Sequence, residues 1–207
     1  VEAGLPNLEK HIESVQQFGK PVVVAINKFG TDTNEEVEIV RARCEQLGAT
    51  VAISDHHAQG GKGAIDLANL VIERFGGEEQ GESQGLRPLY DLDDTVVDKI
   101  KKVARGMYGA RDVAFTKAAE KDLKEIERLG FSNLPVCIAK VPSSLSDDPA
   151  LRGRPHDFEV TVRNIVVNSG AGFLVVITGN IMRMPGLPRK PLALSIDVVD
   201  GEIVGLE

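Results

Sequence analysis

Two loops hold the residues whose chemistry is best suited to binding a ligand. Phe29 lies in the segment NKFGTDT, and the adjacent His56 and His57 lie in SDHHAQGGKG. An aromatic ring and an imidazole facing each other across a slot could hold a flat heteroaromatic ligand, gaining about 0.5–1.5 kcal/mol per aromatic pair beyond area burial. The alternative is that Phe29 covers a sheet edge while both histidines are solvated. A metal site on the histidines is disfavoured because no third ligand is evident.

The segment NKFG at residues 27–30 comes one residue short of the Asn-Lys-x-Asp signature that reads guanine in GTP-binding proteins. That signature uses an aspartate to accept hydrogen bonds from the guanine edge, and Gly30 has no side chain. GGKG at 60–63 also fails as a phosphate loop, because His56 replaces its first glycine and Gly63 replaces the magnesium-binding hydroxyl. The sequence therefore argues against a GTPase.

The GGKG segment itself allows two interpretations. Its backbone N–H groups could hold an anion at the start of the following helix. In the favoured alternative, Gly60 and Gly61 form a tight turn and Gly63 lets the helix pack closely.

Two other segments contain residues that could contribute to a binding site. Lys140 directly follows the apolar run PVCIA and could meet a carboxylate or phosphate, although a lysine at a strand end is more often solvated. The segment MRMPGLPRKP at 182–191 has three prolines within seven residues, which predicts a stiff, partly apolar loop. It either packs over the core as a lid or forms one wall of a pocket.

Hydrophobic spacing predicts the elements that must position these loops. Apolar residues at steps of three and four predict a helix that ends at Gly19. The run PVVVAIN at 21–27 is typical of a strand covered on both faces. Thr33 and Glu36 then form a capping box that begins the next helix, and Gly48 ends it.

A second strand, TVAIS at 50–54, and a helix at about 64–75 complete an alternating helix and strand order. This order is typical of a parallel α/β arrangement with right-handed crossovers. Ligands of such sheets bind at the carboxyl ends of the strands. The loops with Phe29 and the histidines both follow strands, so both are expected at that edge.

The rest of the chain becomes richer in strands toward its end. The predicted elements are a solvated loop at 76–85, helices at about 93–106 and 117–129, a strand at 135–140, and strands thereafter, with a hairpin turn at Asp200 and Gly201. The predicted fold class is α/β, in three layers, with one mixed and mostly parallel sheet flanked by helices and a strand-rich C-terminal third. Residues 1–207 are predicted to form a single α/β domain.

Composition disfavours several classes of function. The 207 residues include 31 acidic and 24 basic ones, for a net charge of −7, which gives no general attraction to nucleic acid or anionic lipid. No apolar run approaches the ~20 residues that span a bilayer.

Cys44 and Cys137 are expected to be buried free thiols in a reducing cytosol. Because the chain starts at Val1, without Met, and runs at once into a helix, it is expected to be a piece of a longer protein.

A series of segments resembles, in order, the C-terminal third of the formate–tetrahydrofolate ligase family, which is also called 10-formyltetrahydrofolate synthetase. The resemblance covers essentially the whole chain; its segments are GLPNLEKHIESVQQFGKPVVVAINKFGTDT, GGKGAIDLA, YGARDVAFT, LGFSNLPVCIAK, SLSDDP, GAGFLVVITGNIMRMPGLPRKP and IDVVDGEIVGL. It implies an ATP-dependent cytoplasmic ligase of one-carbon metabolism that often forms homo-oligomers. Such an enzyme phosphorylates formate to formyl phosphate, and N10 of tetrahydrofolate then attacks the activated carbonyl.

The resemblance also implies how the work is divided along the ligase chain. The family's phosphate loop lies in an N-terminal domain that no segment here matches, so ATP and magnesium are expected to bind mainly outside this chain. No catalytic or metal-binding residue is assigned here. What this chain is expected to supply is the folate-binding side.

The site residues implied by the resemblance lie in the loops described above. The family's pterin slot is an aromatic sandwich; the phenylalanine of its N-x-F segment maps onto Phe29, and His57 occupies the position of a usual tryptophan. An imidazole offers less stacking area, so weaker folate binding than in tryptophan-bearing relatives is expected. The supporting candidates are Ile53, His56, Pro185, Gly186 and Leu187. The alternative function is a non-catalytic binding or assembly module that docks on partners through its N-terminal amphipathic helix.

Overall fold

The computed structural model describes residues 1–75, 85–179, 181 and 189–205. Its helices and partly parallel strands confirm the predicted α/β class. The predicted order of elements in the first 75 residues is also confirmed, with three short helical turns added. These elements are η1 (Glu2–Gly4), α1 (Leu5–Gln16), β1 (Val23–Asn27), α2 (Asn34–Gln46), β2 (Thr50–Ser54), α3 (His56–Gln59), η2 (Gly60–Ala64) and α4 (Ile65–Phe75).

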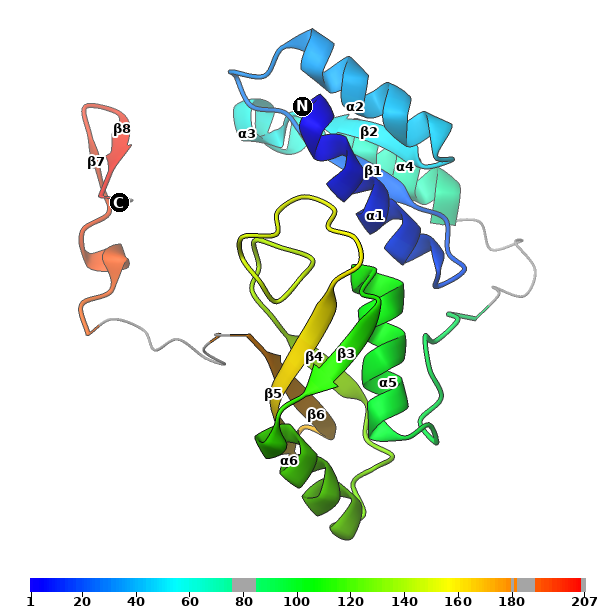
Figure 1. Ribbon diagram of the computed structural model, residues 1–207. Coiled ribbons are helices and arrows are strands. Elements are labelled where there is room, and N and C mark those ends of the chain that lie inside the picture. The colour runs from blue at the N-terminus through cyan, green and yellow to red at the C-terminus, as the bar shows by residue number, and fades with distance from the viewer. Residues whose placement is uncertain (76–84, 180, 182–188, 206–207) are drawn as a thin grey trace.

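The strands β1 and β2 form a parallel pair with helices on both of its faces. Val24 lies opposite Val51, and this face packs against α1 and α2 around the buried Ile12 and Cys44. Successive side chains of a strand point to opposite faces. The other face of β2, which includes the buried Ala52, is therefore the one available to α4, and α4 contacts β2 and lies behind the pair in Figure 1.

The second part of the chain forms a mixed four-stranded sheet in the order β3-β5-β6-β4. The pairs β3–β5 and β4–β6 are parallel, whereas β5 and β6 run antiparallel. The elements are α5 (Val96–Val103), the π-helical turn η3 (Ala104–Tyr108), β3 (Asp112–Phe115), α6 (Lys117–Arg128), β4 (Val136–Ala139), β5 (Glu159–Asn168) and β6 (Phe173–Thr178).

The main hydrophobic core lies between this sheet and the helices α5 and α6. Ile100 and Ile126 are buried on the two helices, and Val160 and Val176 are buried on β5 and β6. Strand β3 is absent from the sequence-based prediction because its four residues are too few for a clear period. Its place in the sheet comes from pairing with β5, which lies far along the chain.

The expectation of one continuous sheet is wrong, because the described strands form three separate sheets. Helix α1 lies between the first two and joins them through polar contacts (Figure 1). The buried Lys10 ammonium donates to the carbonyl of Gly106 at 2.6 Å, and the buried Ser14 hydroxyl donates to that of Met107 at 3.0 Å. A helix between the two sheets keeps their edge strands from pairing. The extent of the predicted single domain, residues 1–207, stays a prediction.

The predicted strand-rich ending and its hairpin are confirmed. After η4 (Leu192–Leu194), β7 (Asp197–Val199) pairs antiparallel with β8 (Glu202–Val204). Asp200 and Gly201 connect the two strands, and both have positive φ. Positive φ at both positions is required by the two-residue turn whose twist matches that of the flanking strands.

The expectation that both cysteines are buried holds for one of them. Cys44 is buried between helices and sheet, but Cys137 is exposed. Val136 and Ile138, on either side of Cys137 along β4, pack against the main core, so the Cys137 side chain points to the opposite face of the sheet.

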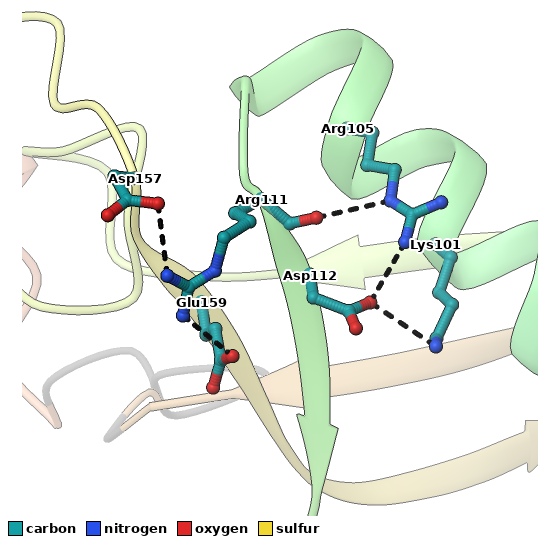
Figure 2. Close-up of polar contacts among 6 residues, drawn as sticks. All are labelled: Lys101, Arg105, Arg111, Asp112, Asp157 and Glu159. Atoms are coloured by element: carbon teal, nitrogen blue, oxygen red, sulfur yellow. Dashed lines mark hydrogen bonds and ion pairs between the residues drawn. The ribbon is translucent and has the colours of Figure 1, made fainter.

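A cluster of charged side chains holds together the amino ends of β3 and β5 (Figure 2). Arg111 donates to Asp157 and to Glu159, each at 3.0 Å, while Arg105 and Lys101 both contact Asp112 at 3.2 Å. Partly exposed pairs of this kind contribute about 0–1 kcal/mol each. They lie at the amino edge of these strands, opposite the edge where ligands of parallel sheets bind. We therefore interpret the cluster as structural.

Candidate functional site

The loop after β1 presents Phe29 on a fixed backbone. The N–H of Phe29 donates to the Asp32 carboxylate at 2.8 Å, and the N–H of Asp32 donates back to the carbonyl of Phe29 at 3.0 Å. The capping box that follows is confirmed: the N–H of Glu36 donates to the Thr33 hydroxyl, and the N–H of Thr33 donates to the Glu36 carboxylate. Phe29 itself is 53% exposed, so its backbone is held while the residue remains at the surface.

The loop after β2 is more ordered than the sequence predicts, since His56 begins the short helix α3. Nδ1 of His56 is 2.9 Å from the hydroxyl of Ser54, which is buried at the end of β2. This hydrogen bond ties His56 back to the strand. The contact was not predicted, although a serine at the carboxyl end of a strand is a visible signal.

Gly63 closes this loop by a close backbone approach. The N–H of Asp55 donates to the carbonyl of Gly63 at 3.0 Å, and a Cβ at Gly63 would lie 2.2 Å from the Asp55 carbonyl oxygen. Gly60 has a φ of +59°, which suits a tight turn. Both observations support the interpretation of these glycines as packing and turn residues, in preference to an anion site.

Phe29 and His57 are in ring contact across the two loops. Their ring centroids lie 5.5 Å apart and their planes are tilted by 46°. A flat ligand stacked between two rings needs about 7 Å between them, because each face contact takes about 3.5 Å. Both side chains are exposed, so a change of rotamer is enough to part the rings. The structure thus brings Phe29 and His57 together, and the role of these two residues in folate binding stays a prediction.

The other candidate residues divide between described and undescribed parts of the chain. Ile53 is half-buried on β2 and lies opposite Ile26 of β1, directly before Ser54. Pro185, Gly186 and Leu187 lie outside the described residues.

Lys140 lies at the carboxyl end of β4. Its ammonium donates to the carbonyl of Val141 at 2.7 Å and lies 5.4 Å from the centre of the Tyr108 ring. Partial burial lowers the pKa of Lys140 below its usual range. A local carbonyl and a ring face therefore already hold this charge.

Three cavities elsewhere were not predicted from the sequence. The most polar, of about 660 Å³, lies between α5 and α6 and is lined by acidic residues and Lys124. An apolar one of about 630 Å³ lies beside Phe18, Leu89 and Met107, and one of about 380 Å³ lies beside Asp147 and Arg163. Neither Phe29 nor His57 lines any of the three.

No helix among residues 1–75, 85–179 and 189–205 is long and apolar enough to cross a membrane. Within the same part of the chain, no three metal-ligating side chains come together.

The fold and the site define the class of this protein. Parallel strands covered by helices make it an α/β protein, and two rings in contact lie on the loops at the carboxyl edge of these strands, which is the edge where ligands of such sheets bind. The model of the family described as formate–tetrahydrofolate ligase matches residues 1–207. The chain therefore belongs to the formate–tetrahydrofolate ligase family.

Curated relatives of the same name support this placement. The chain is 47% identical over 206 residues to the formate–tetrahydrofolate ligase of Bacteroides thetaiotaomicron, covering 100% of this chain and 37% of the relative. It is 48% identical over 203 residues to that of Bacteroides fragilis, covering 98% of this chain and 36% of the relative. It is 46% identical over 206 residues to that of Phocaeicola vulgatus, covering 100% and 37%. The chain thus spans about 37% of the length of the relatives it matches.

Proposed function

We propose that this chain supplies the tetrahydrofolate-binding side of an ATP-dependent ligase that forms 10-formyltetrahydrofolate from formate. Membership of the family supports the reaction class. The observation that carries the folate role is the contact of the Phe29 and His57 rings at the carboxyl edge of β1 and β2. Two rings on adjacent loops suit a flat bicyclic pterin better than they suit a phosphate or a peptide.

In this proposal the pterin enters between the two rings after one of them swings aside. Phe29 then covers one face of the pterin and His57 covers the other. The loop backbones stay in place, since Asp32 and Gly63 hold them by hydrogen bonds. The role of this chain is to orient N10 of the folate toward the activated formyl group.

The reaction itself transfers the γ-phosphoryl group of ATP to formate, which gives formyl phosphate and ADP. N10 then attacks the formyl carbon, the bond to phosphate breaks, and inorganic phosphate leaves with the proton lost from N10. Because the family's phosphate loop is expected in an N-terminal domain that no segment of this chain resembles, we assign ATP and magnesium to the part of the ligase outside this chain.

The alternative, an assembly module that docks through its N-terminal helix, finds less support. Ile12 of α1 is buried against α2 and the strands, and Lys10 and Ser14 are buried against η3. The face of α1 that such docking would use is thus largely occupied by its own chain.

The test uses a hybrid ligase in which this chain replaces the matching 37% of the Bacteroides thetaiotaomicron enzyme. We expect the hybrid to form 10-formyltetrahydrofolate and the 207-residue chain alone to form none. Calorimetry with tetrahydrofolate should show that Phe29→Ala weakens binding to the hybrid by about tenfold or more, which corresponds to about 1.4 kcal/mol. Phe29→Leu keeps apolar area without a ring, so its affinity for tetrahydrofolate should lie between that of the unmodified hybrid and that of Phe29→Ala.

Two results would overturn this proposal. Turnover by the 207-residue chain alone would show that the proposed division of labour is wrong. An active hybrid whose folate affinity is unchanged by Phe29→Ala would place the pterin elsewhere.

A further inference from the structure

Helix α4 exposes a continuous apolar stripe. Of its residues, none is buried, although the helix is rich in large apolar side chains. Ile65 is 52%, Ile72 65% and Phe75 51% exposed, while Val71 is 40% exposed and Ala68 is also exposed. At 3.6 residues per turn these five positions fall within an arc of about 120° on the helix. We call these five residues the α4 stripe.

The α4 stripe adjoins the face by which the helix is attached to its own chain and extends well beyond it. Leu67 and Leu70 are half-buried and lie together on another side, and α4 contacts β2. Asp66 and Glu73 lie between these leucines and the other edge of the stripe. A surface helix usually has one apolar face, turned to the core, and a polar remainder. The apolar surface of helix α4 is thus wider than the face that contacts its own chain, and the described residues leave the remainder of it open.

The sheet beside α4 is also only partly covered. It consists of two parallel strands among the described residues, whereas parallel sheets are usually larger and are covered on both faces. Ala25 on β1 is exposed, although its register partner Ala52 on β2 is buried. Apolar surface is therefore left open on the strand as well as on the helix.

The length of the relatives indicates what covers this surface. They contain well over half of their residues outside the matched part, so a large body of the same polypeptide is available. A lipid surface fits poorly, since the chain has a net charge of −7 and Asp66 and Glu73 border the stripe. Large exposed apolar patches on soluble proteins mark interfaces. We propose that the α4 stripe is the surface on which the rest of the ligase chain packs.

Thiol reactivity tests this interface directly. Cys137→Ser removes the exposed native thiol, and Cys44 is buried, which raises its pKa and keeps it unreactive. In this background, Ile72→Cys reports on the stripe, and Leu129→Cys, at a position 45% exposed on the C-terminal side of α6, is the matched control. The rate of reaction with N-ethylmaleimide is measured in the 207-residue chain and in the hybrid ligase, without ATP or folate.

We expect the thiol introduced at position 72 to react at least about tenfold more slowly in the hybrid, because interface cores are packed as densely as protein interiors. The control thiol at position 129 should react at similar rates in both proteins. Circular dichroism confirms that each variant is folded before its rate is compared. Phe75→Cys gives a second reporter on the same stripe.

Equal rates at position 72 in the two proteins would overturn the proposal. Protection that already exists in the 207-residue chain and increases with its concentration would also overturn it, in favour of a second copy. The inference depends on family membership and not on the folate role of Phe29. Loss of folate binding with intact protection would therefore count against the proposed function alone.

Discussion

The ring centroids of Phe29 and His57 lie 5.5 Å apart, with their planes tilted by 46°. The two rings come from loops that are separate in sequence and adjacent in the parallel pair β1–β2. Each ring occupies space that a pterin stacked on the other would need. In the proposed folate site, binding of the pterin therefore has to replace this ring–ring contact by two ring–ligand contacts.

Replacing His57 by Trp is expected to tighten folate binding. An indole offers a larger face than an imidazole, and aromatic contacts contribute about 0.5–1.5 kcal/mol each, so the dissociation constant of tetrahydrofolate should fall by about fivefold. Calorimetry on the hybrid ligase measures this change. His56→Trp is the matched control, because the Ser54 contact orients that neighbouring side chain separately. Equal tightening of folate binding by both variants would contradict the proposal that the side chain at position 57 stacks on the pterin.

A methyl group at Gly63 should disturb the loop that carries the histidines. Its Cβ would lie 2.2 Å from the Asp55 carbonyl oxygen, so the backbone must shift, and we expect a loss of about 1–3 kcal/mol of unfolding free energy. Gly61→Ala is the control, because its Cβ meets no atom within 4 Å. Urea denaturation of both variants checks the difference. Similar stabilities would show that the Gly63–Asp55 approach is not required.

The core of the second part should depend strongly on Ile126, which is only 1% exposed. Ile126→Ala leaves a cavity against the four-stranded sheet, and such changes cost about 2–5 kcal/mol. Leu129→Ala, three residues later and 45% exposed, should cost less than about 1 kcal/mol. Urea denaturation followed by circular dichroism measures both. A small effect at Ile126 would contradict the burial of α6 against the sheet.

Asp112 should make stability depend on pH in the acid range. The backbone N–H of Val113 and then the ammonium of Lys101 hold the pKa of this carboxyl below its ordinary value of 3.8 (Figure 2). A lowered folded-state pKa means that the stabilisation is present above pH 3.8 and is lost as pH falls through the lower value. Asp112→Asn should therefore reduce the free energy of unfolding at neutral pH.

The difference between Asp112→Asn and the parent chain should disappear well below pH 3.8, where both side chains are neutral. Urea denaturation across the acid range measures it. High salt should weaken only the part due to Lys101 and Arg105, since screening acts on exposed charges. A difference that persists in strong acid would show that the variant acts through packing.

Local patterns in the sequence determined much of the fold of the first 75 residues. Apolar spacing placed α1 and α2, and the reciprocal hydrogen bonds of Thr33 and Glu36 fixed where α2 begins. The turn at Asp200 and Gly201 was also predictable, because positive φ at both positions is required there. These features depend on residues a few positions apart, so their physical cause is contained in the spacing itself.

Only the tertiary structure decided how distant segments meet. Strand β3 exists because β5 pairs with it, and Lys10 is buried because Gly106 offers a carbonyl. Cys137 is exposed because its neighbours Val136 and Ile138 take the core face of the sheet. The sequence indicated that Phe29 and His57 would share one edge, but it could not determine that the two rings touch. Such contacts depend on packing between segments far apart in the chain, for which the sequence contains no local period.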